Sequence, residues 1–344
     1  MDLPITGTNP PDRRDPHDWA VVLAGGQGRR LAHLTLTEGG VSVPKQFCSL
    51  GHGASLIHAT LQRAAAVAPP ERTLATVTES HAGWWRTLYG SLPAQNLLVQ
   101  PEQRGTGIGI LHPLLEILRR DSAASVLILP SDHYFSDEAA IARGLRAAMK
   151  LTRRYPHQVL LLGFEPEQHD ADLGYIVPGA TRTDELFTVS RFIEKPDASH
   201  LRALADAGAL SNSFILAANA HGLLELFERR CPRVVAQLRR FAGAASEPAA
   251  QREMARAFHE IPTLDFSQEI ITPDISALRV LRLPRCGWSD LGTPARLDRV
   301  LRQHAAAIDA VPWAPPEVRG RVDLAARWRR HQGNCASSVS SLRS

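Results

Sequence analysis

The sequence lacks several features that would place it in a familiar class of protein. Its four cysteines, Cys48, Cys231, Cys286 and Cys335, show no CxxC spacing, which argues against a structural zinc site and a disulfide framework. The apolar runs have the length of strands and are interrupted by charge or glycine, so none suits a bilayer span. The first 18 residues hold four prolines among charges and no apolar core of a secretory signal. We therefore expect reduced thiols, no membrane partner, a cytoplasmic location and a flexible leader over residues 1–18.

Two common phosphate-binding patterns are also missing. The pattern GxxxxGK[ST] does not occur, and GxGxxG fails because Gly26 and Gly28 are followed by Leu31 where the third glycine belongs. Lys45 lies in the region, about 20 residues further on, where a dinucleotide-binding unit carries an acidic residue for the ribose. A hydride-transfer enzyme is thus disfavoured. The net charge of +4 suits an anionic ligand, but the basic residues are dispersed, so we expect small phosphates and not nucleic acid.

A glycine-rich turn is the most distinctive stretch that is present. The apolar run from Ala20 to Leu23 stops at the sequence AGGQG and is followed at once by two arginines, the second of which is Arg30. Glycines at such a turn let backbone N–H groups approach phosphate oxygens closely, and Arg30 adds positive charge there. Lys45 follows Pro44 on a stiffened segment and could reach the same phosphates. Taken alone, such a loop is more often a turn with solvated arginines.

The motif GGQGRRL followed by PKQF resembles the signature of the sugar-phosphate nucleotidyltransferases, and the PKQF form is similar to that of the mannose-1-phosphate guanylyltransferase branch. Later segments in the same order extend the resemblance from about residue 19 to 300. It implies an α/β, Rossmann-like fold in which helices flank a mainly parallel sheet, and alternating strand-like and helix-like segments favour the same arrangement. We expect a nucleotidyltransferase domain at 19–305 and a C-terminal tail, a short appendage, at 306–344.

The segment from Gln100 to Gly107 opens a helix expected to run to about Arg120, and Thr106 could cap it. A plain helix cap would explain Thr106 but not the polar residues before it. The segment resembles the family's QPxxRGTAP element, with Gly107 and Ile108 in place of Ala-Pro. The resemblance implies that the nucleotide is bound by Leu23, Ala24, Gly25, Gly26, Gly28, Gln100, Arg104, Gly105, Thr106 and Asp132.

Two carboxylates are candidates for a metal site. Asp132 follows the strand-like run Ser125–Leu129, and Asp290 follows the run Leu278–Leu283 within GWSDLG. Carboxylates at strand ends beside a phosphate loop are placed to hold Mg²⁺ against phosphate oxygens. Asp132 on its own would more often be a turn residue. The matching family elements, PSDH and GWSDLGT, imply that both aspartates bind Mg²⁺, with Arg30, Lys45 and Asp132 as the catalytic set.

Three later segments resemble the sugar-binding elements of the family. They imply that the sugar phosphate is held by Gly174, Tyr175, Glu194, Lys195, Asn212 and Asp290. Leu173 and Ser211 depart from the usual pattern beside two of these residues. Adjacent strand residues such as Glu194 and Lys195 face opposite sides unless a bend at Pro196 turns both inward, and a surface ion pair is the alternative.

The expected activity is formation of GDP-mannose and pyrophosphate from GTP and mannose 1-phosphate with Mg²⁺. The sugar phosphate attacks the α-phosphorus in line and needs no protein base, so catalysis rests on positioning and charge neutralisation. Two alternatives stay open: the same reaction with glucose 1-phosphate or another nucleotide, and a non-catalytic nucleotide-sugar sensor. A homodimer also stays open, because the sequence does not reveal the oligomeric state.

Overall fold

The computed structural model describes residues 14–51, 53–168, 170–183, 186–241, 248–305, 308 and 322–341. Most of the expected leader and most of residues 306–321 lie outside the described residues. Within the described ranges, Cys48, Cys231 and Cys286 are free thiols. No helix in these ranges combines the length and apolar character that a bilayer crossing requires.

A nine-stranded sheet forms the centre of the described chain, in the order β3-β2-β1-β4-β8-β5-β9-β7-β6. Its strands are β1 Asp18–Leu23, β2 Thr73–Thr78, β3 Leu97–Gln100, β4 Ser125–Pro130, β5 Val159–Phe164, β6 Gly174–Thr183, β7 Leu186–Glu194, β8 Leu210–Asn219 and β9 Leu278–Leu283. The four strands β3, β2, β1 and β4 are mutually parallel, as the Rossmann-like expectation requires.

The second half of the sheet is mixed, so the expectation of a mainly parallel sheet is wrong there. Strand β8 runs antiparallel to β4, β5 and β6, and β7 runs antiparallel to β6 and β9, whereas β5 and β9 are parallel. Only two residues separate β6 from β7 in the sequence. A parallel pair needs a crossover of a dozen or more residues, so this short connection dictates an antiparallel hairpin.

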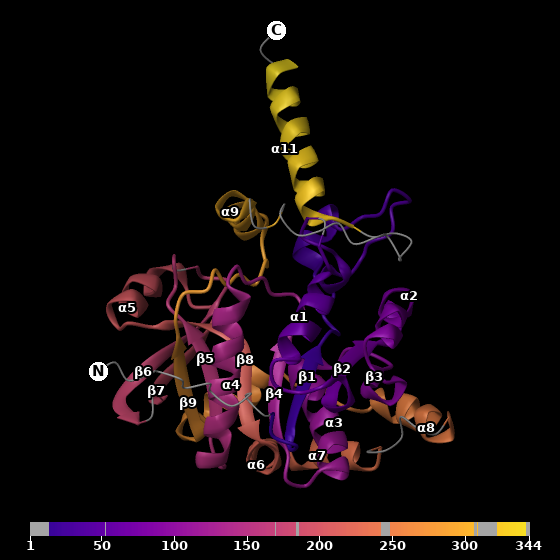
Figure 1. Cartoon of the computed structure of the whole chain (residues 1–344), viewed down its shortest axis with the longest axis vertical. Coiled ribbons are helices and arrows are strands. Elements are labelled where there is room, and N and C mark those ends of the chain that lie inside the picture. Colours follow the sequence, from indigo (N-terminus) through magenta and orange to yellow (C-terminus); the bar gives the residue numbers. More distant parts are fainter. Residues whose placement is uncertain are drawn as a thin grey trace, which may run out of the picture.

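Helices cover both faces of the sheet (Figure 1). The α-helices in the described ranges are α1 Leu56–Ala64, α2 Ala82–Trp85, α3 Gly105–Arg120, α4 Glu138–Arg154, α5 Leu201–Asp206, α6 Ala220–Arg230, α7 Pro232–Arg239, α8 Pro248–Phe258, α9 Pro294–Gln303 and α11 Leu324–Ser341, of which α11 does not lie on the sheet (Figure 1). Alternate residues of β1 enter opposite apolar layers: Val22 packs in the layer that holds Ile57 of α1, and Val21 in the layer that holds Ile108 of α3. This is the pattern expected for a strand buried on both faces.

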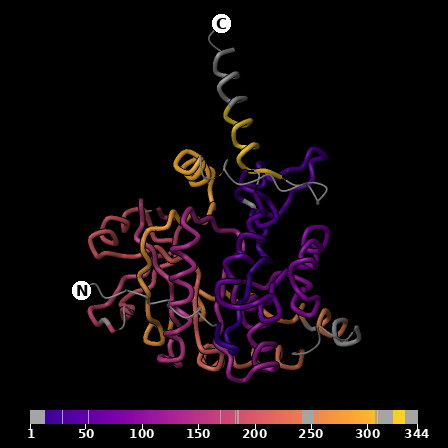
Figure 2. Tube along the Cα trace, viewed as in Figure 1, coloured from indigo at the N-terminus to yellow at the C-terminus, as the bar shows by residue number. Residues whose placement is uncertain are grey.

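The start of α11 is tied to the segment that follows Lys45. Ser49 forms a parallel bridge with Asp323, in which the Ser49 N–H donates to the Val322 carbonyl at 2.9 Å and the Leu324 N–H donates to the Ser49 carbonyl at 2.9 Å. Val322, Leu324 and Ala325 are buried, and the turns of α11 that follow them project away from the body of the molecule (Figure 2). The beginning of α11 therefore packs on the core and is part of the folded body.

The sheet brings the functional motifs to one edge. Strands β1, β3 and β4 are parallel, so the glycine turn after β1, Gln100 at the end of β3 and Asp132 after β4 all lie at the same side. Strand β9 runs parallel to β5, and β5 shares the antiparallel partner β8 with β4, so the turn that carries Asp290 also opens at this side. The antiparallel strand β8 begins at this edge and presents Asn212 there.

Candidate active site

The glycine turn packs directly against the segment that carries Lys45. Gly28 has φ +58°, and a Cβ built on it would lie 2.9 Å from the Lys45 Cβ, so the position admits only glycine. The Gln46 side-chain amide donates to the carbonyl oxygens of Ala24 at 2.7 Å and Gly26 at 2.9 Å. The sequence reasoning missed Gln46. The Q of PKQF was the only signal for it, and its side chain fixes the shape of the turn.

A cavity of about 200 Å³ opens between the glycine turn, the start of α3 and the end of β4. Many of the expected nucleotide-binding residues line it, namely Leu23, Gly25, Gly26, Gln100, Gly105, Thr106 and Asp132, together with Gln103, His133 and Phe214. Ala24, Gly28 and Arg104 are not among its lining residues. Arg104 is instead paired with Glu102 at 2.8 Å and donates to the His259 carbonyl at 3.1 Å.

The start of α3 is shaped by contact with a distant residue, Leu264. Gly105 has φ +82°, and a Cβ there would lie 2.3 Å from the Leu264 carbonyl oxygen, which also accepts from the Gly107 N–H at 2.8 Å. A Cβ on Gly107 would meet the Leu264 side chain at 2.7 Å, so an alanine at this position would require Leu264 to shift. The expectation that Thr106 caps α3 is wrong: its hydroxyl accepts from the Phe266 N–H at 2.9 Å.

Lys45 joins the Asp132 carboxylate to the backbone of the turn that carries Asp290. Its buried ammonium lies 2.7 Å from Asp132 Oδ2 and donates to the backbone carbonyls of Asp290 at 2.6 Å and Leu291 at 3.3 Å. Burial opposes ionisation of Asp132, but the adjacent Lys45 ammonium outweighs it and lowers the pKa of Asp132 below its usual range. Asp132 is therefore an ionised carboxylate at neutral pH.

His133 beside it is neutral at that pH, because burial lowers the pKa of His133 to about 4. Its Nδ1 accepts a hydrogen bond from the Trp288 indole N–H at 3.2 Å. The contact ties the β4 turn to the turn that carries Asp290, in agreement with the pairing of Tyr134 and Ser289 backbones.

Asp290 is held by its own turn and by an arginine that the sequence reasoning missed. Asp290 Oδ1 accepts from the Gly292 N–H at 3.0 Å and lies 3.2 Å from Arg296 Nη1. A Cβ on Gly292 would lie 2.5 Å from Asp290 Oδ2, so a side chain there would displace the carboxylate. Arg296 comes from the first turn of α9 and is 5% exposed. Nothing in the sequence pattern marked it except its place just after GWSDLGTPA.

The residues present fit a magnesium ion. Mg²⁺ prefers oxygen ligands and keeps several waters and substrate phosphate oxygens, so one or two carboxylates suffice. Asp132 and Asp290 supply two carboxylates whose turns meet at Lys45. In the described part of the chain, no group of three or more His, Cys, Asp or Glu residues could hold a metal ion, so an all-protein cage of the kind that calcium or zinc favours is not offered there.

The expected sugar-binding residues come together in part. A Cβ on Gly174 would meet Glu194 Oε2 at 2.6 Å and the Asn212 Cβ at 3.4 Å, so these three residues adjoin closely. Burial raises the pKa of Glu194 despite the opposing charge of Lys195. Lys195 has φ +47°, which confirms a bend before Pro196. Tyr175, in contrast, is fully buried, and its hydroxyl donates to the Asp170 carbonyl at 3.0 Å and accepts from the Asp170 N–H at 2.6 Å.

Arg30 is exposed at the mouth of the site. Its side chain is 53% exposed, and its Nη1 lies 3.5 Å from Asp172 Oδ2, in the connection between β5 and β6. Arg30 therefore faces solvent, whereas Lys45 is buried.

Comparison with known proteins gives a family match over most of the chain. A family model described as nucleotidyl transferase matches residues 19–306. The xanthan biosynthesis protein XanB of Xanthomonas campestris pv. campestris (strain B100) is 28% identical over 288 residues, which are 82% of this chain and 59% of that protein. The mannose-1-phosphate guanylyltransferase of Salmonella muenchen is 28% identical over 183 residues, 52% of this chain and 37% of that protein. The chain thus spans less than two thirds of the length of these curated relatives.

Solved structures give the same fold. A Thermus thermophilus protein described as a mannose-1-phosphate geranyltransferase superposes with a TM-score of 0.70 at 28% identity and covers 83% of this chain and 79% of its own. A Helicobacter pylori protein described as a mannose-6-phosphate isomerase superposes with a TM-score of 0.60 at 18% identity and covers 79% of this chain and 99% of its own. At this identity the similarity indicates the fold alone.

Proposed function

Because the chain belongs to the nucleotidyl transferase family, we propose that it joins GTP and mannose 1-phosphate to give GDP-mannose and pyrophosphate. The observation that carries the proposal is the meeting of Asp132, Lys45 and the Asp290 turn beside a cavity lined by Gly25, Gly26 and Gln100. A glycine turn with backbone N–H groups suits phosphates, and paired carboxylates at the same edge suit the divalent ion that accompanies them.

The reaction needs no group on the protein to remove a proton. One oxygen of the sugar phosphate, nearly a dianion at neutral pH, forms the new bond to the α-phosphorus while the bond to the β-phosphate oxygen breaks and pyrophosphate leaves. Asp132 and Asp290 would hold Mg²⁺, and the bound ion would neutralise part of the negative charge of the phosphates. Arg30 adds positive charge at the entrance, where the triphosphate would lie.

The sequence suggested that Lys45 contacts the phosphates of the nucleotide; we propose a positioning role for it instead. Its ammonium is committed to Asp132 and to two backbone carbonyls. We propose that it acts chiefly by fixing the two carboxylate turns relative to each other. Positioning of this kind matters because a displacement of about 1 Å can cost a hundredfold in rate.

The sugar side of the site is formed by Glu194, Asn212 and Gly174. The close approach of Glu194 to Gly174 leaves no room for a side chain there, so the backbone itself forms part of the surface. We propose that Glu194 and Asn212 bind sugar hydroxyls and that Lys195, exposed beside them, binds the sugar phosphate. Tyr175 supports the site from behind by holding Asp170.

GTP and mannose 1-phosphate are proposed on the resemblance of PKQF, the SDH element and GWSDLGT to the guanylyltransferase branch and on the similarity to the Salmonella muenchen enzyme. Guanine presents donors that a selective site must pair with acceptors, and Glu102 or backbone carbonyls near Gln100 are the candidates. A buried polar group left unpaired by the wrong base costs about 1–3 kcal/mol, roughly tenfold to a hundredfold in selectivity.

The test is pyrophosphate release measured over a grid of GTP, ATP, UTP and dTTP against mannose 1-phosphate and glucose 1-phosphate with Mg²⁺. We expect the highest kcat/KM for GTP with mannose 1-phosphate. A clear preference for glucose 1-phosphate or a pyrimidine nucleotide would replace the substrate pair and leave the reaction type standing. Nucleotide binding without pyrophosphate release for any pair would favour a nucleotide-sugar sensor instead.

A further inference from the structure

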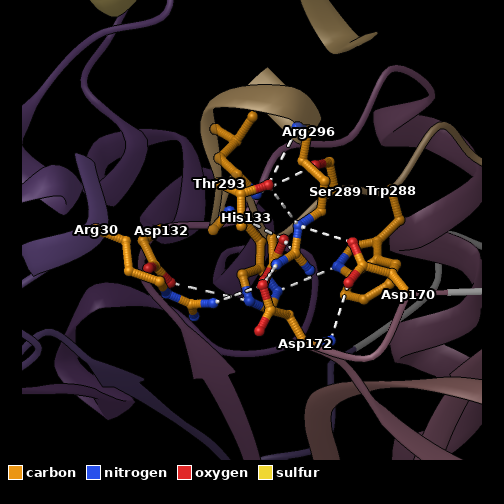
Figure 3. A network of polar contacts seen from close by, with 12 residues as sticks. Arg30, Asp132, His133, Asp170, Asp172, Trp288, Ser289, Thr293 and Arg296 are labelled. Atoms are coloured by element: carbon orange, nitrogen blue, oxygen red, sulfur yellow. Dashed lines mark hydrogen bonds and ion pairs between the residues drawn. The ribbon is translucent and has the colours of Figure 1, made fainter. Parts of the chain in front are cut away.

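One carboxylate oxygen is shared by two arginines from opposite sides of the site. Asp172 Oδ2 lies 3.5 Å from Arg30 Nη1 and 3.7 Å from Arg296 Nη2 (Figure 3). Arg30 follows the glycine turn, whereas Arg296 belongs to α9 and contacts Asp290. Asp172 itself lies in the connection between β5 and β6. The contact therefore joins the proposed triphosphate cation to the part of the chain that carries Asp290.

The two arginines differ in how firmly they are held. Arg296 is 5% exposed, lies near three carboxylates, and has two buried nitrogens, Nη1 and Nη2, that lack a well-formed hydrogen bond. Arg30 is 53% exposed and Asp172 is 52% exposed, so water and ligands reach the pair that they form. A buried arginine keeps its carboxylate neighbours, while an exposed pair exchanges partners readily.

The position of Asp172 is set by its neighbours and does not depend on Arg30. The Asp172 N–H donates to Asp170 Oδ1 at 2.9 Å, and the Asp170 backbone is held by the buried Tyr175 hydroxyl. The contacts of Asp170 therefore hold the turn that places Asp172 beside Arg30. If Arg30 moves to a phosphate, Asp172 can stay beside Arg296.

We propose that Asp172 pairs with Arg30 in the ligand-free protein and competes with the nucleoside triphosphate for the Arg30 guanidinium. Binding of the triphosphate transfers Arg30 from Asp172 to phosphate oxygens, and Asp172 remains with Arg296. A phosphate group offers an arginine several charged oxygens and two-point hydrogen bonding, so it wins over a single exposed carboxylate contact. The inference rests on the proposed function, because it takes the ligand to be a nucleoside triphosphate.

The test is the Kd of GTP, measured by titration calorimetry with Mg²⁺ and without sugar phosphate, for the wild-type protein and the Asp172→Asn variant. Since an exposed ion pair is worth at most about a factor of five in an equilibrium constant, we expect the variant to bind GTP about twofold to fivefold more tightly. The gain should shrink at high salt, which screens exposed charges. It should be absent for GMP, whose single phosphate lies away from the triphosphate cation.

Asp170→Asn is the matched control. Asp170 lies in the same turn, 3.7 Å from Arg296 Nε, and the change removes the same charge, yet its side chain is not paired with Arg30. We expect Asp170→Asn to leave the Kd of GTP unchanged. In an Arg30→Ala background, Asp172→Asn should not tighten GTP binding, because Asp172 then has no Arg30 guanidinium to pair with.

An unchanged or weaker affinity in Asp172→Asn would overturn the inference, and so would an equal gain in Asp170→Asn, which would indicate a general charge effect. If the wild-type protein bound none of GTP, ATP, UTP and dTTP, the proposed function itself would fall. Binding by the wild-type protein with no effect of Asp172→Asn would overturn only the role of Asp172.

Discussion

Replacement of Lys45 by methionine tests whether the ammonium is a structural tie or a free phosphate cation. Methionine has a similar shape and fills the same space without a charge, so packing against Gly28 is retained. What is lost is the contact with Asp132 Oδ2 at 2.7 Å and with the Asp290 carbonyl at 2.6 Å. The change therefore leaves a carboxylate and backbone carbonyls without their donor.

The magnitude follows from how buried these groups are. Removing one partner of a fully buried ion pair costs about 3–5 kcal/mol. The Asp132 side chain is 35% exposed, so water offsets part of that loss. The Asp290 and Leu291 carbonyls lose a donor as well, each worth about 1 kcal/mol. We expect Lys45→Met to lower the free energy of unfolding by about 4 kcal/mol, of which roughly half comes from each of these losses.

The assay is urea unfolding at pH 7 followed by tryptophan fluorescence, with Arg30→Met as the matched control. Arg30→Met removes the same charge from an exposed side chain, so its stability should stay within about 0.5 kcal/mol of the wild type. Adding Asp132→Asn to Lys45→Met should recover part of the loss, because the unpaired carboxylate is removed. If Lys45→Met were as stable as Arg30→Met, the ammonium would not tie the two turns together.

Three further predictions concern the turn that carries Asp290, the sugar side and the far side of the sheet. Gly292→Ala should lower kcat/KM in the pyrophosphate assay at least about tenfold, since the new Cβ would lie 2.5 Å from Asp290 Oδ2; unchanged activity would refute the role of this turn. Lys195→Ala should raise the KM for mannose 1-phosphate while the KM for GTP holds, and the reverse pattern would contradict the assignment of the sugar phosphate. Burial raises the pKa of Asp18 to about 6, although Arg153 opposes it. The folded protein favours the neutral form of Asp18. The contribution of Asp18 to the free energy of unfolding is therefore greatest below the ordinary pKa of 3.8 and falls, by at most about 3 kcal/mol, as pH rises to about 6. Asp18→Asn should abolish the difference in the free energy of unfolding between pH 4 and pH 7, measured by urea unfolding. A difference that persists in this variant would show that another group causes it.

The sequence predicted the elements whose ends are marked by local chemistry. Helix α3 ends at Arg120 as expected, after a last turn that carries Arg119 and Arg120. Strand β9 spans Leu278–Leu283 as expected, bounded by proline and charge. Antiparallel β8 was not foreseen, because an alternating pattern of strands and helices says nothing about the direction in which a strand enters the sheet.

The site was predictable where motifs lie next to strands and unpredictable where distant segments meet. The glycine turn, Gln100 and Asp132 share one cavity because parallel strands deliver them to one edge. The contact of Leu264 with Gly105 joins residues far apart in the chain, and a single sequence carries no signal of such proximity. Tyr175 was expected to touch the sugar for its place in a motif, and the structure buries it instead.

Strand β8 limits how substrate choice could be re-engineered. It is hydrogen-bonded along one side to β4, which delivers Asp132, and along the other to β5, and its start pairs with β6. A chimera with its junction inside residues 210–219 would break pairing on both sides at once. Exchange of the connection that holds Asp170 and Asp172, or of the turn after β9, would leave that pairing whole. Asn212, the proposed sugar ligand on this strand, is therefore best varied by single substitutions that leave the pairing of β8 whole.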